Sequence, residues 1–237
     1  MKKRFFYVFA SFLICLYACV SVNDNNVSND NEEQQTQVPV VGKLTNMKQF
    51  VDVNVVGDMQ IVYNHENNYT VKVESSNDAF NSLVVYVKEN ELYICSKNDN
   101  NAKDSVDVMK DVKVYVSSPD LHNVKVTGGG SFSTSSPIDA SHFDIKLTGS
   151  GNVGFSNMIS SNSIDVNVTG SGSVRIADLK CVKLMTQVTG TGSVAFDSVN
   201  VKEAKSSVTG SGSITMKGKV GNHIKQINGQ GKINFAQ

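Results

Sequence analysis

Apolar and polar residues alternate through the second half of the chain in a pattern that returns about every twenty residues. Six copies centre on a Gly-x-Gly triplet, and the first glycines of the triplets stand at positions 128, 149, 170, 190, 210 and 229. In the second copy, apolar residues occupy every other position from Phe143 to Leu147 and again from Val153 to Phe155. A period of two is that of a β-strand, so the pattern predicts short strands that meet at a glycine corner.

The even spacing of the copies predicts how these strands assemble. Steps of 19 to 21 residues indicate a solenoid, in which each unit buries its apolar face against its neighbours. We expect an all-β fold in which residues 119–237 form a regular, right-handed parallel β-helix with one coil per repeat. Equivalent residues then stack in rows. An inner apolar row starts at Phe132, and an outer row of hydroxyls runs from Thr127 to Thr209.

Residues 41–118 carry the same motif in a less regular form. Apolar residues flank Gly57 at the spacings of the later copies, for example Val53 before it and Ile61 after it. Further alternating runs are separated by polar loops that are too long for a coil of about twenty residues. We interpret this region as irregular, longer-looped N-terminal β coils of the same solenoid. A separate small β domain is the alternative.

The N-terminal segment indicates export. Three basic residues precede an apolar run that ends at Ala18, which is too short to span a membrane and is typical of a secretory signal. The run closes with Leu16-Tyr17-Ala18-Cys19, which looks like a bacterial lipobox. We therefore expect residues 1–18 to be a lipoprotein signal peptide and Cys19 to be lipidated, which would make the chain an outer membrane lipoprotein. Residues 19–40 are polar and should form a disordered tether. Ordinary signal-peptide cleavage nearby is the alternative.

The net charge bears on the class of partner, and the cysteine content bears on whether the chain forms disulfides. Without the signal peptide the chain has 19 basic and 22 acidic residues, a net charge of −3, which argues against nucleic acid as a partner. Apart from Cys19, the mature chain keeps Cys95 and Cys181, both in or beside apolar strand patterns. This placement indicates buried thiols, although an oxidising envelope would permit a disulfide.

Two short motifs resemble known signatures. Residues 149–154 match the dinucleotide fingerprint G-x-G-x-x-G, but a strand pattern follows them where the fingerprint requires a helix. The triplet is therefore a corner, and we expect no cofactor. Asp104-Ser105-Val106 and Asp197-Ser198-Val199 resemble the D-[S/T]-aliphatic sequon of exported Bacteroidetes proteins, which makes Ser105 and Ser198 candidate O-glycosylation sites.

A pair of carboxylates is the one candidate for chemistry. Asp144 and Asp165 each stand five positions before a corner glycine, so we expect them on one outer row of adjacent coils, about 5 Å apart. That separation suits a retaining glycosidase. However, Lys146 lies beside the pair, and no Arg or aromatic cluster surrounds it. No histidine stands at a ligand spacing from another histidine, a cysteine or a carboxylate, so we expect no catalytic residues and no metal site.

The order of these motifs carries a family resemblance. Phe50-Val51-Asp52-Val53 leads to Gly57-Asp58, Ser118-Pro119-Asp120-Leu121 precedes the repeats, and Thr-Gly-Ser-Gly recurs. On these features, residues 41–237 resemble the putative auto-transporter adhesin, head GIN domain family. The resemblance implies a β-helical envelope lipoprotein of Bacteroidetes that acts in adhesion or envelope binding, and it brings no catalytic residues.

The expected function follows from the outer surface. A hydroxyl ladder without a charged cleft favours a non-enzymatic binding or adhesin-like module, whose partner would be a glycan or an envelope protein. A polysaccharide-active β-helix enzyme, a lyase or a glycosidase, is the alternative. Four lysines crowd the last coil, where charge discourages edge pairing, so we expect a mainly monomeric protein.

Overall fold

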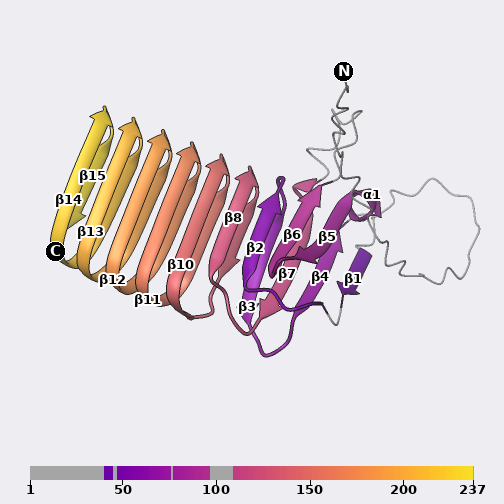
Figure 1. Ribbon diagram of the computed structural model, residues 1–237. Helices are drawn as coiled ribbons and strands as arrows, with labels where there is room; N and C mark the ends of the chain where they lie inside the picture. Colours follow the sequence, from indigo (N-terminus) through magenta and orange to yellow (C-terminus); the bar gives the residue numbers. More distant parts are fainter. Residues whose placement is uncertain (1–39, 45–46, 76, 97–108, 237) are drawn as a thin grey trace, which may run out of the picture. The chain divides into compact units, whose positions relative to one another are not determined.

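The computed structural model describes residues 40–44, 47–75, 77–96 and 109–236, which all belong to one compact unit. This unit is almost entirely strand, with one short helix, and its fifteen strands form a single sheet (Figure 1). Among the described residues, no helix is long and apolar enough to cross a membrane. In chain order the elements are β1 (Val40–Leu44), β2 (Asp52–Val56), β3 (Gln60–His65), β4 (Thr70–Ser75), α1 (Asn77–Asn81), β5 (Leu83–Lys88), β6 (Glu91–Ser96), β7 (Lys113–Ser118), β8 (Asn123–Gly128), β9 (Ser131–Thr134), β10 (Ile138–Gly149), β11 (Asn152–Gly170), β12 (Ser173–Gly190), β13 (Ser193–Gly210), β14 (Ser213–Gly229) and β15 (Lys232–Ala236).

The regular part is the predicted β-solenoid, with parallel coils about twenty residues apart (Figure 1). Pairing between β11 and β12 falls into three segments, which define three sides of a coil. We call residues 152–155 side A, residues 158–161 side B and residues 163–170 side C, and use the same names for equivalent residues of other coils. Side C ends at the corner glycine.

Backbone packing at the corner explains the repeated glycines. Gly149 and Gly170 lie in register in adjacent coils, with φ of +119° and +114°. A Cβ on Gly170 would lie 2.4 Å from the carbonyl oxygen of Gly149. That oxygen accepts hydrogen bonds from the N–H groups of Ser171 and Gly172 in the next coil. Only glycine fits both the backbone conformation and the close approach.

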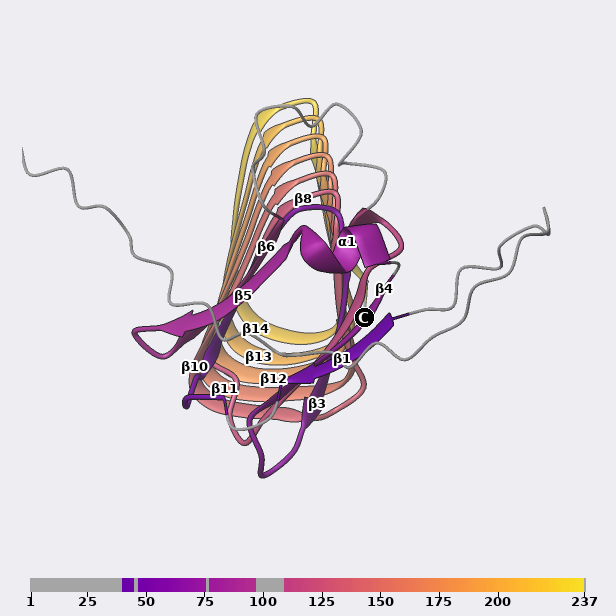
Figure 2. The same cartoon turned by 90° about the vertical axis from the view of Figure 1, so that its right-hand side faces the viewer.

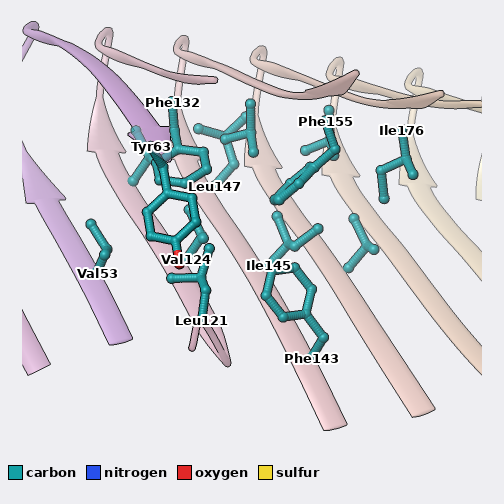
Figure 3. Packing of buried hydrophobic residues seen from close by; sticks show 14 of the residues in the cluster. Val53, Tyr63, Leu121, Val124, Phe132, Phe143, Ile145, Leu147, Phe155 and Ile176 are labelled. Atoms are coloured by element: carbon teal, nitrogen blue, oxygen red, sulfur yellow. The ribbon is translucent and has the colours of Figure 1, made fainter. Parts of the chain in front are cut away.

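The interior of the coils is filled by the predicted apolar rows. Phe132 lies in register with Val153, and the row continues to Ile214 with every member buried. The aromatic ring of Phe132 lies between those of Tyr63 and Phe155, with centroids 6.2 Å and 5.8 Å away (Figure 3). This continuous core joins the N-terminal strands to the regular coils.

The N-terminal part shares the register of the repeats but not their connections. β2 and β3 pair in parallel with β8 and β9, and β6 and β7 pair with the other edges of β2 and β3. The remaining strands are antiparallel: β4 pairs with β1 and β7, and β5 pairs with β6. Glu89 and Asn90 connect β5 to β6 with φ of 53° and 63°, which is the geometry of a tight hairpin turn. This turn reverses the chain where a regular coil would continue around its corner.

The two ends of the solenoid differ. At the N-terminal end, α1 and β5 lie across the opening, and Ala79 of α1 is part of the buried core (Figure 2). At the C-terminal end, Ile227 is 47% exposed, whereas Val208, which lies in register one coil further in, is fully buried. Ile233 and Phe235 are partly buried, as expected for the last members of inner rows.

Candidate functional site

A polar groove crosses several coils on side B and its following corner. It has a volume of about 590 Å³ and is lined by residues 139–141, 160–162 and 180–182 together with Asn200 and Lys202. This volume is in the range of small-molecule sites in proteins. Seven of the eleven lining residues carry a hydroxyl, amide or ammonium group, and none is aromatic.

One row of small residues contributes to the lining of the groove. Ala140, Ser161 and Cys181 lie in register on side B of successive coils. None of them carries a side chain as large as Val201, which follows Cys181 in the same row.

Charge varies along the groove. The outward row of side B reads Asp139, Ser160, Lys180 and Asn200 in consecutive coils. Lys202 also lines the groove near Lys180. The groove therefore has one carboxylate, that of Asp139, at one end and two ammonium groups toward the other. This gradient suits a polar ligand that carries a negative group.

The two described cysteines are free thiols, as the sequence indicated, but only Cys181 is buried, whereas Cys95 is partly exposed. Cys181 lines the groove but is only 6% exposed, and burial raises the pKa of its thiol to about 12. Burial also raises the pKa of Cys95, which is half-buried. The Cys181 thiol is therefore protonated at neutral pH and is a poor nucleophile.

A second polar feature adjoins the groove at the start of side C. Asp144 and Asp165 lie in register on adjacent coils, as the sequence predicted, and Met185 follows them in the row. The structure adds His142, whose Nε2 lies 3.4 Å from Oδ2 of Asp144. Its Nδ1 lies 2.7 Å from Oγ of Ser163. Neither carboxylate lines the groove.

The position of His142 differs from the expectation based on sequence. Spacing along the chain predicts no histidine near other ligand residues, whereas the structure brings one nitrogen and two carboxylate oxygens within 4.8 Å of one another. A signal is present in the sequence, because His142 and Asp144 are two residues apart and so point to the same face of one strand. Only the register of the next coil brings Asp165 to them, and a search along the chain alone misses it.

The acidic row continues toward the N-terminal strands. Asn123 lies in register between Asp52 and Asp144. Burial raises the pKa of Asp52, and the charges of Glu91 and Asp144 raise it further against the opposing effect of His122. This outer row of side C therefore holds three carboxylates, Asp52, Asp144 and Asp165, while Lys125 and Lys146 lie in the next outward row.

The other predicted sites fall in different places. Residues 149–154 form the corner and lead into a strand, so they do not have the geometry of a dinucleotide site. Ser198 is exposed, and Asp197 before it pairs with Arg175 at 2.7 Å. Cys19 and Ser105 lie outside the described residues, so their modification stays a prediction.

Comparisons with known proteins agree on the fold. A family model described as putative auto-transporter adhesin, head GIN domain, matches residues 49–177 and 165–237. No curated protein matches the chain. The crystal structure of a putative lipid binding protein from Parabacteroides distasonis ATCC 8503 covers 85% of this chain and 98% of its own, with 20% identity and a TM-score of 0.68. A putative adhesin from Bacteroides fragilis NCTC 9343 covers 84% of this chain and 98% of its own, with 18% identity and a TM-score of 0.65.

Proposed function

Because the chain belongs to the putative auto-transporter adhesin, head GIN domain family, we propose that it is a non-enzymatic binding module of the cell envelope. The observation that carries the proposal is the groove on side B. We propose that this groove binds a glycan with an acidic group, which Lys180 and Lys202 would contact at the basic end. Seryl hydroxyls and asparagine amides along the rest of the groove would bond to sugar hydroxyls.

The residue types that line the groove favour a sugar over an acyl chain as the ligand, and binding over hydrolysis. An acyl chain would need an apolar lining, and the groove offers Ala140 and Val182 among mostly polar residues. Glycoside hydrolysis usually needs two carboxyl groups that flank the scissile bond, and Asp139 is the one carboxylate in the groove. The pair Asp144 and Asp165 lies outside it. These features favour binding without turnover.

A glycan array combined with a reducing-sugar assay tests this function. The full-length chain, labelled and applied in its native state, should bind uronic-acid polysaccharides and release no reducing ends from them. A heat-unfolded sample is the control for non-specific adhesion. Turnover of any glycan that is lost in Asp144→Asn would contradict the proposal and favour the enzyme alternative.

We further propose that Cys19 carries the lipid anchor and places the protein in the outer membrane. The support is the lipobox-like Leu16-Tyr17-Ala18-Cys19 at the end of the apolar run. Metabolic labelling with palmitate should mark the wild-type chain and not Cys19→Ala. Cys15→Ala is the matched control, because it removes a cysteine of the same segment and should keep the label. Palmitate retained in Cys19→Ala would refute the anchor without affecting the binding proposal.

A further inference from the structure

We propose that His142, Asp144 and Asp165 form a binding site for a divalent transition-metal ion such as zinc. The site lies on the outer surface, where β10 and β11 run side by side. One ligand atom from each residue falls within 4.8 Å of the others. The inference rests on the geometry of these side chains and does not depend on the proposed glycan function.

The imidazole is oriented as in many metal sites. Ser163 lies 2.7 Å from Nδ1 of His142, while Nε2 points to Oδ2 of Asp144 at 3.4 Å. When Nδ1–H donates to Ser163, Nε2 presents a lone pair to a carboxylate oxygen. Metal-ligating histidines typically donate their other ring N–H to such a partner. Two lone-pair atoms then face each other, and a shared cation satisfies both.

Apart from the imidazole of His142, no basic side chain of the described residues lies within ion-pair distance of the two carboxylates. They lie in register on adjacent strands, where like charges repel. Among the described residues, no lysine or arginine lies within 4.0 Å of either carboxylate. Lys146, two positions after Asp144 on the same face, makes no ion pair with it. A bound cation would relieve this repulsion.

An independent observation comes from the neighbouring strand. Asn123 lies in register with Asp144 on the other side of β10, and its Oδ1 is buried without a hydrogen-bond partner. Buried polar atoms nearly always have a partner. The side chain of Asn123 belongs to the same outer row as the two carboxylates, and amide oxygens are among the groups that bind cations.

The donor set selects the class of ion. Imidazole nitrogen together with carboxylate oxygens is typical of zinc and its first-row neighbours, whereas calcium takes six or more oxygen ligands. Ligand atoms around a tetrahedral zinc ion lie about 3.4 Å apart. Nε2 of His142 and Oδ2 of Asp144 already have that separation, and the ligand atom of Asp165 lies within 4.8 Å of those of the other two residues.

Isothermal titration of the full-length chain with zinc chloride, after alkylation of accessible thiols, tests the site. We expect one zinc ion per chain and at least about a tenfold loss of affinity in His142→Ala and in Asp165→Asn. Cobalt substituted for zinc should give visible d–d absorption bands in the wild type that are absent from His142→Ala. The matched controls are His65→Ala and Asp178→Asn, which change residues elsewhere and should leave affinity unchanged.

Three outcomes would overturn the inference. Zinc affinity in His142→Ala could equal that of the wild type, or His65→Ala could lose as much affinity as His142→Ala does. Calcium could also bind more tightly than zinc with no effect of His142→Ala, which would indicate a site made of oxygen atoms alone.

Thermal unfolding without metal should be the same for all variants, and added zinc should raise the Tm of the wild type and the two controls only.

Discussion

The glycine corner and side B belong to the same coils but differ in how much the residue at equivalent positions changes from one coil to the next. At the corner, glycine stacks on glycine from Gly128 to Gly229, and the outer threonine before it repeats almost without change. On side B, the outward residue changes from Asp139 to Ser160, Lys180 and Asn200. The corner is uniform because the backbone of one coil lies against that of the next, which leaves no room for a Cβ.

This difference indicates that the corner residues stabilise the fold, whereas the outward residues of side B would contact a ligand. Substitutions at the corner should change stability, because they disturb backbone contacts that every coil shares. Substitutions of outward residues on side B should leave stability unchanged and alter binding. The predictions that follow test this separation, from the largest expected effect to the smallest.

The largest effect should come from the inner row on side A, which belongs to neither region and forms part of the core of the coils. Ile176 is fully buried between Phe155 and Phe196, and Ile176→Asp would place an unpaired charge in this core. We expect a loss of more than about 4 kcal/mol in unfolding free energy, or failure to fold. Urea unfolding followed by circular dichroism measures it. Thr169→Asp, at an exposed outer position, is the control and should change the free energy by less than about 1 kcal/mol.

Two glycines give a matched test of the corner. Gly190 has φ of +113°, and an added Cβ would lie 2.5 Å from the carbonyl oxygen of Gly170. Gly190→Ala should therefore cost about 3 kcal/mol in unfolding free energy. A Cβ added to Gly154 would meet nothing within 4 Å, and φ is not positive there, so Gly154→Ala should be neutral or stabilise by about 0.5 kcal/mol. Equal losses in the two variants would refute the account of the corner.

The Cys181 thiol gives a pH-dependent prediction for side B. Its pKa is about 12 in the folded chain and near the ordinary value of 9.0 in the unfolded chain. The unfolded state therefore releases the proton first, and stability should fall as pH rises from 9.0 toward 12. This part of the pH dependence should disappear in Cys181→Ala, as urea unfolding at a series of pH values would show.

Thiol titration with a chromogenic disulfide at mildly alkaline pH checks the same residue. Cys95 is more exposed than Cys181 and should react faster in the native chain. Cys181 should react only after unfolding. Rapid reaction of Cys181 in the folded protein would show that the floor of the groove is open to reagents.

The periodic part of the molecule could be predicted in detail from the sequence. The alternation around each Gly-x-Gly triplet indicated the inner rows and the register of Asp144 with Asp165, because one repeat fixes all equivalent positions. The spacing around Gly57 also indicated that β2 has the register of the repeats, and the structure pairs β2 in parallel with β8. Repetition supplies this information, since a single short strand has many alternative partners.

The non-periodic features could not be predicted in the same way. The hairpin at Glu89 and Asn90 depends on positive φ at both residues, which is common for Asn but which local preferences do not indicate for Glu89. The groove is lined by residues of four successive coils, among them Ala140, Ser161 and Cys181. Each of these residues looks ordinary in its own repeat, so only the stacked structure shows the hollow.

The most direct test of the central claim compares groove and surface lysines in binding to immobilised polygalacturonate. Lys180→Ala/Lys202→Ala should lose at least about tenfold in affinity with an unchanged Tm, because it removes the basic end of the groove. Lys205→Ala/Lys217→Ala removes two exposed charges outside the groove and should bind like the wild type. Equal affinity of the groove variant and the wild type, or an equal loss in both variants, would contradict recognition at side B.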